Sequence, residues 1–85
     1  MNPNLTVPAD VPREVLAQLR DDAGLTYVAI ARRTGVARSA LCRLATAAHV
    51  RVGTADALYA LQAEVEMERP DLARKWAVDE PTATR

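Results

Sequence analysis

The arginines are the residues of this sequence whose type and spacing most directly indicate a chemical role. Residues 27–53 contain five arginines and no acid, whereas two bases and four acids precede this basic block and four bases and seven acids follow it. The chain is neutral as a whole but concentrates positive charge in one segment. A guanidinium donates paired hydrogen bonds to phosphate oxygens or to guanine O6 and N7, so the block predicts a surface that contacts nucleic acid. Its arginines are Arg32, Arg33, Arg38, Arg43 and Arg51.

Other kinds of chemistry have few side chains to work with. The chain has one cysteine, Cys42, and one histidine, His49, so neither an internal disulfide nor a metal site is expected. We find no nucleophile paired with a base and no glycine-rich phosphate loop, and we expect no enzymatic activity, cofactor or small-molecule ligand. We interpret Cys42 as a small packing or surface residue, with a redox switch as the alternative, and His49 as a surface or phosphate-facing side chain.

The N-terminus and the apolar runs bear on where the protein is located. Residues 1–10 lack the basic start and the apolar stretch of a signal peptide. No run approaches the roughly 18 to 20 apolar residues that a membrane span needs. We therefore expect a cytoplasmic protein that does not contact a membrane.

Helix-forming residues dominate the composition, so helices are expected to position the basic block. Apolar residues make up 49% of the 85 residues, Phe is absent and Ile occurs once. This predicts an all-α fold, a compact bundle of about five short helices, in which the spacing of residues 26–46 indicates a helix-turn-helix. We divide the chain into a flexible N-terminal arm (1–9), a helix-turn-helix DNA-binding domain (10–68), a C-terminal helix as candidate dimerisation element (69–78) and a tail (79–85).

Four residues mark the expected helix starts. Asp10, Thr26 and Thr54 are good N-cap residues, because their side-chain oxygens accept hydrogen bonds from backbone N–H groups of the first turn. Pro70 suits the first turn itself, where its missing N–H costs nothing. We expect residues 48–53, between the third and fourth helices, to form a loop.

A set of steric requirements between residues 26 and 46 predicts the helix-turn-helix. Two short helices that pack at a steep angle need an apolar residue and then a very small one on the first helix, which Ile30 and Ala31 provide. The turn needs a residue that tolerates positive φ, which is Gly35, followed by a residue that becomes buried. The second helix must then present apolar residues five and eight positions further on. These last three slots are filled by Val36, Leu41 and Leu44.

The central sequence of this motif is Ile30-Ala-Arg-Arg-Thr-Gly-Val-Ala-Arg-Ser-Ala-Leu41. With it, the segment 25–65 resembles the Cro/C1-type (XRE-like) helix-turn-helix repressors of phages and plasmids. Length and arginine content are also similar to those of the small Kor-type plasmid repressors. The resemblance implies a transcriptional repressor that binds a palindromic operator in double-stranded DNA as a homodimer. Its recognition helix, over about residues 38–47, would lie in the major groove.

The resemblance also implies which residues contact DNA. Those placed to read base edges are Ala37, Arg38, Ser39 and Arg43. Those placed to contact phosphates are Thr26, Tyr27, Thr46 and Arg51. The family often has Ser or Thr at the position of Ala37 as a helix cap, and the missing cap costs about 1 kcal/mol. For Arg32 and Arg33, phosphate contact and plain solvation are both open.

The last part of the chain holds the candidate dimer contacts, which are Tyr59, Leu72 and Trp76. Leu72 and Trp76 stand four apart on one helix face, and their alternative role is to cover the monomer's core. The alternative function for the protein is an interaction module, such as an antitoxin or an accessory subunit with secondary DNA binding. Its acidic helix would dock a basic partner through Glu64, Glu66 and Glu68.

Overall fold

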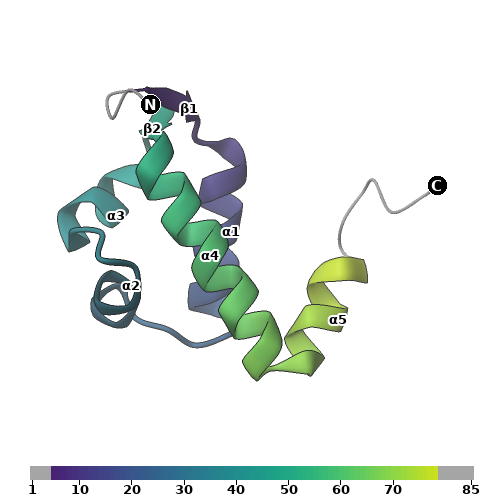
Figure 1. Cartoon of the computed structure of the whole chain (residues 1–85). Coiled ribbons are helices and arrows are strands. Elements are labelled where there is room, and N and C mark those ends of the chain that lie inside the picture. Colours follow the sequence, from purple (N-terminus) through teal and green to yellow (C-terminus); the bar gives the residue numbers. More distant parts are fainter. Residues whose placement is uncertain (1–4, 79–85) are drawn as a thin grey trace.

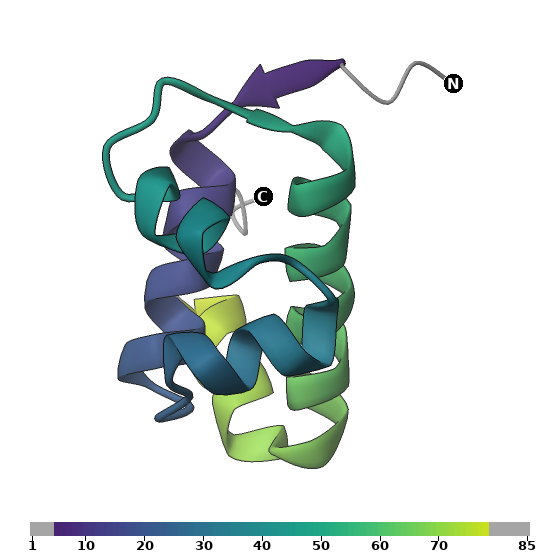
Figure 2. The same ribbon diagram turned by 90° about the vertical axis from the view of Figure 1, so that its left-hand side faces the viewer.

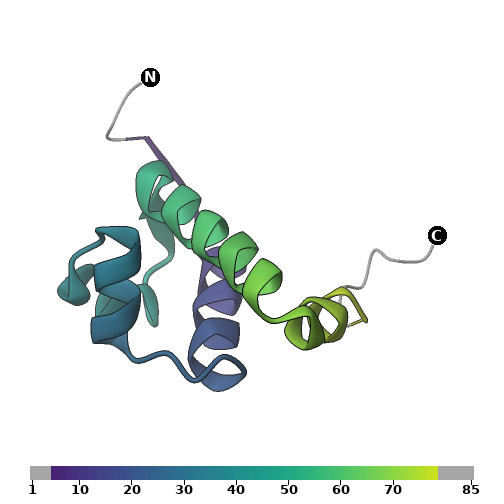
Figure 3. The ribbon, with the colours of Figure 1, turned by 60° about the horizontal axis from the view of Figure 1, so that its bottom comes forward.

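The computed structural model describes residues 5–78, which form five helices and a two-stranded antiparallel ribbon (Figure 1). In chain order the elements are β1 (Thr6–Pro8), α1 (Asp10–Asp21), α2 (Tyr27–Thr34), α3 (Arg38–Leu44), β2 (His49–Arg51), α4 (Val52–Glu68) and α5 (Pro70–Val78). The predicted all-α fold is confirmed, with the short ribbon as an addition. Helices α1 and α4 both begin at the ribbon and pack together, with α2 and α3 on one side and α5 on the other (Figures 1 and 3).

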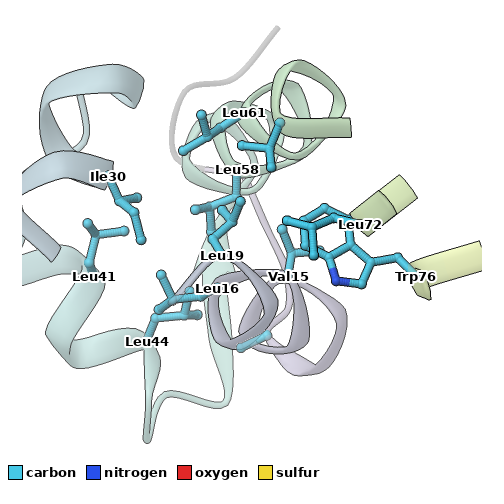
Figure 4. Close-up of a cluster of buried hydrophobic side chains, with 12 residues drawn as sticks. Val15, Leu16, Leu19, Ile30, Leu41, Leu44, Leu58, Leu61, Leu72 and Trp76 are labelled. Carbon is cyan, nitrogen blue, oxygen red and sulfur yellow. The ribbon is translucent and has the colours of Figure 1, made fainter. Parts of the chain in front are cut away.

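Aliphatic side chains from four helices build the centre of the core (Figure 4). Leu19 of α1 and Leu58 of α4 lie in the middle, and Ile30 and Leu41 bring α2 and α3 against them. All four side chains are 0% exposed. Full burial of a leucine or isoleucine contributes about 1.5–3 kcal/mol, so this apolar contact is what holds the helix-turn-helix on α1 and α4.

The helix-turn-helix forms as the sequence predicts. Thr26 caps α2, because its Oγ1 accepts a hydrogen bond from the backbone N–H three residues on, at 3.1 Å. Gly35 ends the helix with φ of +78°, in the left-handed region that favours glycine. Val36 then packs half-buried against the core. Helix α3 begins at Arg38, and Ala37 at its N-cap makes no side-chain capping bond, as its methyl group requires.

The flexible arm predicted over residues 1–9 is wrong for the part that is described, because β1 pairs with β2. Val52 N–H donates to the Leu5 carbonyl and Ala9 N–H donates to the Ala48 carbonyl, both at 3.0 Å. The same pairing turns the predicted loop after α3 into a strand. Sequence periodicity reports local structure, so two three-residue strands that lie far apart in the chain leave no such signal. Residues 1–4 and the predicted tail 79–85 lie outside the described residues.

Three predicted helix boundaries also move. Asp10 is the first helical residue of α1 rather than its cap, and Ala9 holds the cap position. The Asp10 carboxylate instead lies 3.6 Å from a guanidinium one turn on. Helix α4 begins at Val52 instead of after Thr54, because the ribbon leads directly into it. Helix α3 ends at Leu44 and not near residue 47, because the backbone N–H groups of Ala45 and Thr46 donate to carbonyls three residues back, which tightens the last turn.

Helix α5 covers one end of the groove between α1 and α4. Its side chains Leu72 and Trp76 are each 5% exposed and lie against Val15 of α1 (Figure 4). The indole Nε1–H of Trp76 donates to Asp22 at the end of α1, at 2.7 Å. Both residues therefore cover the monomer's own core. The predicted dimer contact through them is corrected, because almost none of their surface is left for a second copy.

The attachment of α5 predicts a pH dependence of stability. The Asp22 carboxylate accepts hydrogen bonds from Lys75 Nζ, at 2.9 Å, and from Trp76. These bonds, the one from Lys75 first, hold the pKa of Asp22 below its usual value. A depressed pKa stabilises the folded state above the unfolded value of about 3.9, and this contribution is lost as the pH falls through the folded-state value.

We therefore expect wild type to lose its stability advantage over Asp22→Asn as the pH falls from about 5 to 2. Thermal unfolding of both proteins across this range measures the difference in Tm. The asparagine keeps an oxygen acceptor but cannot titrate, so it is the matched reference. A difference in Tm that stays constant with pH would contradict the assignment.

Candidate nucleic-acid interface

One face of α3 is buried and the opposite face is open to solvent. Leu41 and Leu44 point into the core, at 0% and 1% exposed, whereas Arg38, Ser39 and Arg43 are exposed. Within residues 5–78, no ion pair or side-chain hydrogen bond engages the guanidinium of Arg38 or Arg43. Both predicted base-reading arginines are therefore available to a ligand on the same short helix.

The end of α3 is held by an arginine from another helix. Arg13 of α1 donates from Nε to the Leu44 carbonyl, at 3.1 Å, and from Nη2 to the Ala47 carbonyl. These carbonyls are at the negative end of the α3 dipole, where a cation is favourable. The contact therefore gives a charged donor to carbonyls at and just after the end of α3. Sequence analysis missed Arg13, since its partners lie 31 and 34 residues away and backbone carbonyls carry no residue-type signal.

We expect Arg13→Met to destabilise the protein by about 1–3 kcal/mol, because two partly buried carbonyls lose a charged donor. The methionine keeps an unbranched apolar stem and helix propensity. Urea unfolding measures the change. Asp10→Ala is the matched control, since it removes the exposed ion pair of Arg13 and leaves its carbonyl bonds, and it should cost less than about 1 kcal/mol. Equal losses in the two variants would show that the carbonyl bonds contribute nothing.

A hollow of about 730 Å³ separates α3 from the start of α4. Arg43 lines it from α3, and His49 and Arg51 line it from β2, all three exposed. Gly53 and Thr54 of the first turn of α4 also line it, and α4 has no side-chain cap at this end. Free N–H groups and the positive end of a helix dipole attract anions. The uncapped start of α4 therefore lies beside Arg51, an arrangement suited to a phosphate of a nucleic acid, with Arg43 across the same hollow.

The family model for the helix-turn-helix domain matches residues 13–74. The chain belongs to the helix-turn-helix domain family. This family is one of DNA-binding proteins that regulate transcription. No curated protein and no solved structure matches the chain.

The helix-turn-helix presents its two helices on the same side of the molecule (Figure 2). Thr26 and Tyr27, predicted to contact phosphates, lie at the start of α2. Thr26 is exposed, while Tyr27 is half-buried against the core with the Arg20 guanidinium 4.3 Å from its ring centroid. Thr46 is exposed just after α3. The structure therefore brings Arg43 and Arg51 together in one hollow, while Thr26 and Tyr27 stand at the start of the other helix of the motif.

One arginine of the basic block has its charge compensated by glutamates of the protein itself. Arg33 of α2 donates to Glu64 at 3.1 Å and to Glu68 at 2.7 Å, both on α4. These carboxylates, Glu68 first, raise the pKa of Arg33. Arg33 therefore braces the helix-turn-helix against α4 instead of facing a phosphate. Arg32 is exposed, and no described side chain pairs with it.

The same contact bears on the alternative function. An acidic helix that docks a basic partner needs free carboxylates, and two of the three glutamates proposed for it are engaged by Arg33 within the chain. No observation on α4 therefore favours an interaction module over a DNA-binding protein.

The other side chains considered in the sequence, such as the thiol of Cys42, form no catalytic or metal-binding cluster among the described residues. Cys42 is exposed on α3 with a free thiol. Among residues 5–78, no group of three or more His, Cys, Asp or Glu side chains is arranged to hold a metal ion. No helix in this part of the chain has the length and apolar character that crossing a membrane requires.

Proposed function

We propose that this protein is a sequence-specific transcriptional repressor of the Cro/C1 type that binds a palindromic operator as a homodimer. The observation that carries the proposal is the exposed face of α3, where Arg38, Ser39 and Arg43 have no protein partner among the described residues. In this proposal α3 enters the major groove, and the bound protein represses by covering a promoter.

Base reading follows from the side chains on this face. An arginine donates two hydrogen bonds to guanine O6 and N7, so Arg38 and Arg43 favour a half-site that contains guanine. Ser39 accepts or donates a single hydrogen bond, and the exposed methyl of Ala37 suits contact with a thymine methyl. We therefore expect recognition to rest on few side chains, with the two arginines dominant.

Phosphate contacts orient the helix in the groove without reading sequence. Thr26 and Tyr27, at the start of α2, are proposed to contact the backbone on one side of α3. Thr46 and Arg51 are proposed to contact it on the other. The uncapped start of α4 beside Arg51 supports the second contact, because its N–H groups complement a phosphate.

Selection of bound duplexes from a random DNA pool tests the proposal. We expect an inverted repeat that contains guanine, with half-site centres about 10–10.5 base pairs apart, one helical turn. Fluorescence anisotropy at physiological salt should then give about 10³-fold or greater preference for the selected duplex over random DNA. Equal affinity for both would contradict a sequence-specific repressor.

A further inference from the structure

The chain between α3 and β2, residues 45–48, has almost no buried side chain, and we call it the α3–β2 turn. Leu44 ends α3 in the core at 1% exposed, but within the turn only Ala47 is even half-buried. The turn between α2 and α3 differs, because Val36 packs against the core there. Apolar contact therefore does little to fix the path of the chain from α3 to β2.

Hydrogen bonds from the start of α1 hold the α3–β2 turn instead, and Figure 2 shows the two segments side by side. Arg13 donates to the Leu44 carbonyl, at 3.1 Å, and to the Ala47 carbonyl. The backbone N–H of Ala9, at the cap position of α1, donates to the Ala48 carbonyl at 3.0 Å. One guanidinium therefore spans the turn from the end of α3 to its third residue.

The guanidinium of Arg13 has little left to offer a phosphate. Its Nε and Nη2 donate to the two carbonyls, and its Nη1 lies 3.6 Å from the Asp10 carboxylate. Each of its nitrogens thus has a protein partner, whereas the guanidinium groups of Arg38 and Arg43 have none among the described residues. Arg13 therefore acts on a bound duplex through the turn that it holds, and not through a contact of its own.

Side chains proposed to contact DNA stand before, within and after this turn. Arg43, proposed to read a base, is in the last turn of α3. Thr46 lies within the α3–β2 turn and Arg51 at the end of β2, and both are proposed to contact phosphates. Base edges and phosphates are held in fixed relation by the duplex, so the conformation of the turn decides whether base and phosphate contacts form together.

We propose that Arg13 is a positioning residue for operator recognition, which holds the α3–β2 turn so that Arg43 reaches a base while Thr46 and Arg51 contact phosphates. The proposal rests on the proposed function, because it names a residue on which the specificity of that same site depends. Non-specific binding needs only phosphate contacts, so it tolerates a mobile turn. Specific binding requires an ordered turn, and ordering the backbone of one residue lowers a binding constant about tenfold.

The ratio of operator affinity to random-DNA affinity tests the proposal. We expect Arg13→Met to lower this ratio roughly 10-fold and to leave the slope of log K against log salt unchanged, under conditions where circular dichroism shows the variant folded. A slope reduced by about 1 would show that Arg13 contacts a phosphate itself, and an unchanged ratio would show that it only stabilises the fold. Either result overturns the proposal.

Two further variants keep this test sharp. Asp10→Ala is the matched control, since it removes the ion pair of Arg13 and leaves its carbonyl bonds, and it should keep the wild-type ratio. Arg13→Lys keeps the charge but lacks the rigid fork that reaches two carbonyls, so it should lose part of the preference. The lysine variant carries the test if Arg13→Met fails to fold.

Amide hydrogen exchange of the free protein, followed by NMR, separates this proposal from the proposed function. We expect Arg13→Met to speed exchange roughly 10-fold at Ala9 and Ala47, whose N–H groups bond across and within the turn. The Gly35 amide, in the other turn of the motif, is the reference and should change little. A wild type that selects no operator contradicts the repressor. The exchange rates then decide alone, and equal rates in wild type and Arg13→Met overturn the role of Arg13.

Discussion

Arg43→Ala is expected to lower affinity for the selected operator by roughly 5- to 150-fold, equivalent to about 1–3 kcal/mol, and to relax base preference at one position. Arg43 is exposed on α3 with no described protein partner, so its guanidinium enters the complex without breaking an internal bond. Its loss removes a bidentate contact with guanine and leaves the fold intact, because the core side of α3 is unchanged. Anisotropy titrations against the operator and each single-base variant measure both effects. Arg38→Ala should behave in the same way at a different position.

Two further arginines separate base reading from charge. Arg51→Ala should weaken binding to all sequences alike and reduce the slope of log K against log salt by about 1, because a phosphate contact carries no sequence information. Arg74→Ala is the matched control, since Arg74 is exposed on α5, away from α3. Unchanged affinity and base preference in Arg43→Ala would show that this residue does not read the operator.

Trp76→Ala is expected to destabilise the protein by about 3–5 kcal/mol, a large part of the roughly 4–13 kcal/mol available to a domain of this size. Trp76 is 5% exposed and holds α5 against α1 through apolar contact and one hydrogen bond to Asp22. Removal of the indole leaves a cavity in the seam between α5 and the rest of the core. Urea unfolding monitored by circular dichroism measures the loss.

Trp76→Phe separates packing from hydrogen bonding in that seam. The phenyl ring keeps most of the aromatic contact but has no N–H for Asp22, which still accepts from Lys75. We expect it to cost about 1–3 kcal/mol, less than the alanine variant. If Trp76→Ala were nearly neutral, α5 would not be part of the cooperative fold.

Local steric and capping rules explain why the helix-turn-helix was predictable from the sequence. Gly35 satisfies a backbone requirement within the turn, and Thr26 satisfies one at the helix start, so both are visible in a short window of sequence. Ile30 and Leu41 follow helical spacing and are fully buried. The expected absence of a cap at Ala37 also follows from its side chain alone. Each of these features depends on neighbours within a few residues.

The contacts that position the candidate site were not predictable in this way. The sequence carried no prediction for Arg13, and Arg33 belongs to the basic block, with phosphate contact and plain solvation both open for it. In the fold, one holds the end of α3 and the other pairs with glutamates on α4. The charge of a side chain is known from its type, but its partner depends on which helices meet.

The sequence by itself therefore determined the fold class, the helix-turn-helix and the segment that carries the exposed arginines of α3, because spacing along one helix specifies which face is apolar. Only the tertiary structure decided that β1 pairs with β2, that Leu72 and Trp76 are core residues and that Arg33 pairs with a glutamate of α4. The physical reason is that strand pairing, burial of a terminal helix and ion pairs between helices join residues far apart in the chain. These interactions contribute to stability only once the core has brought those residues together.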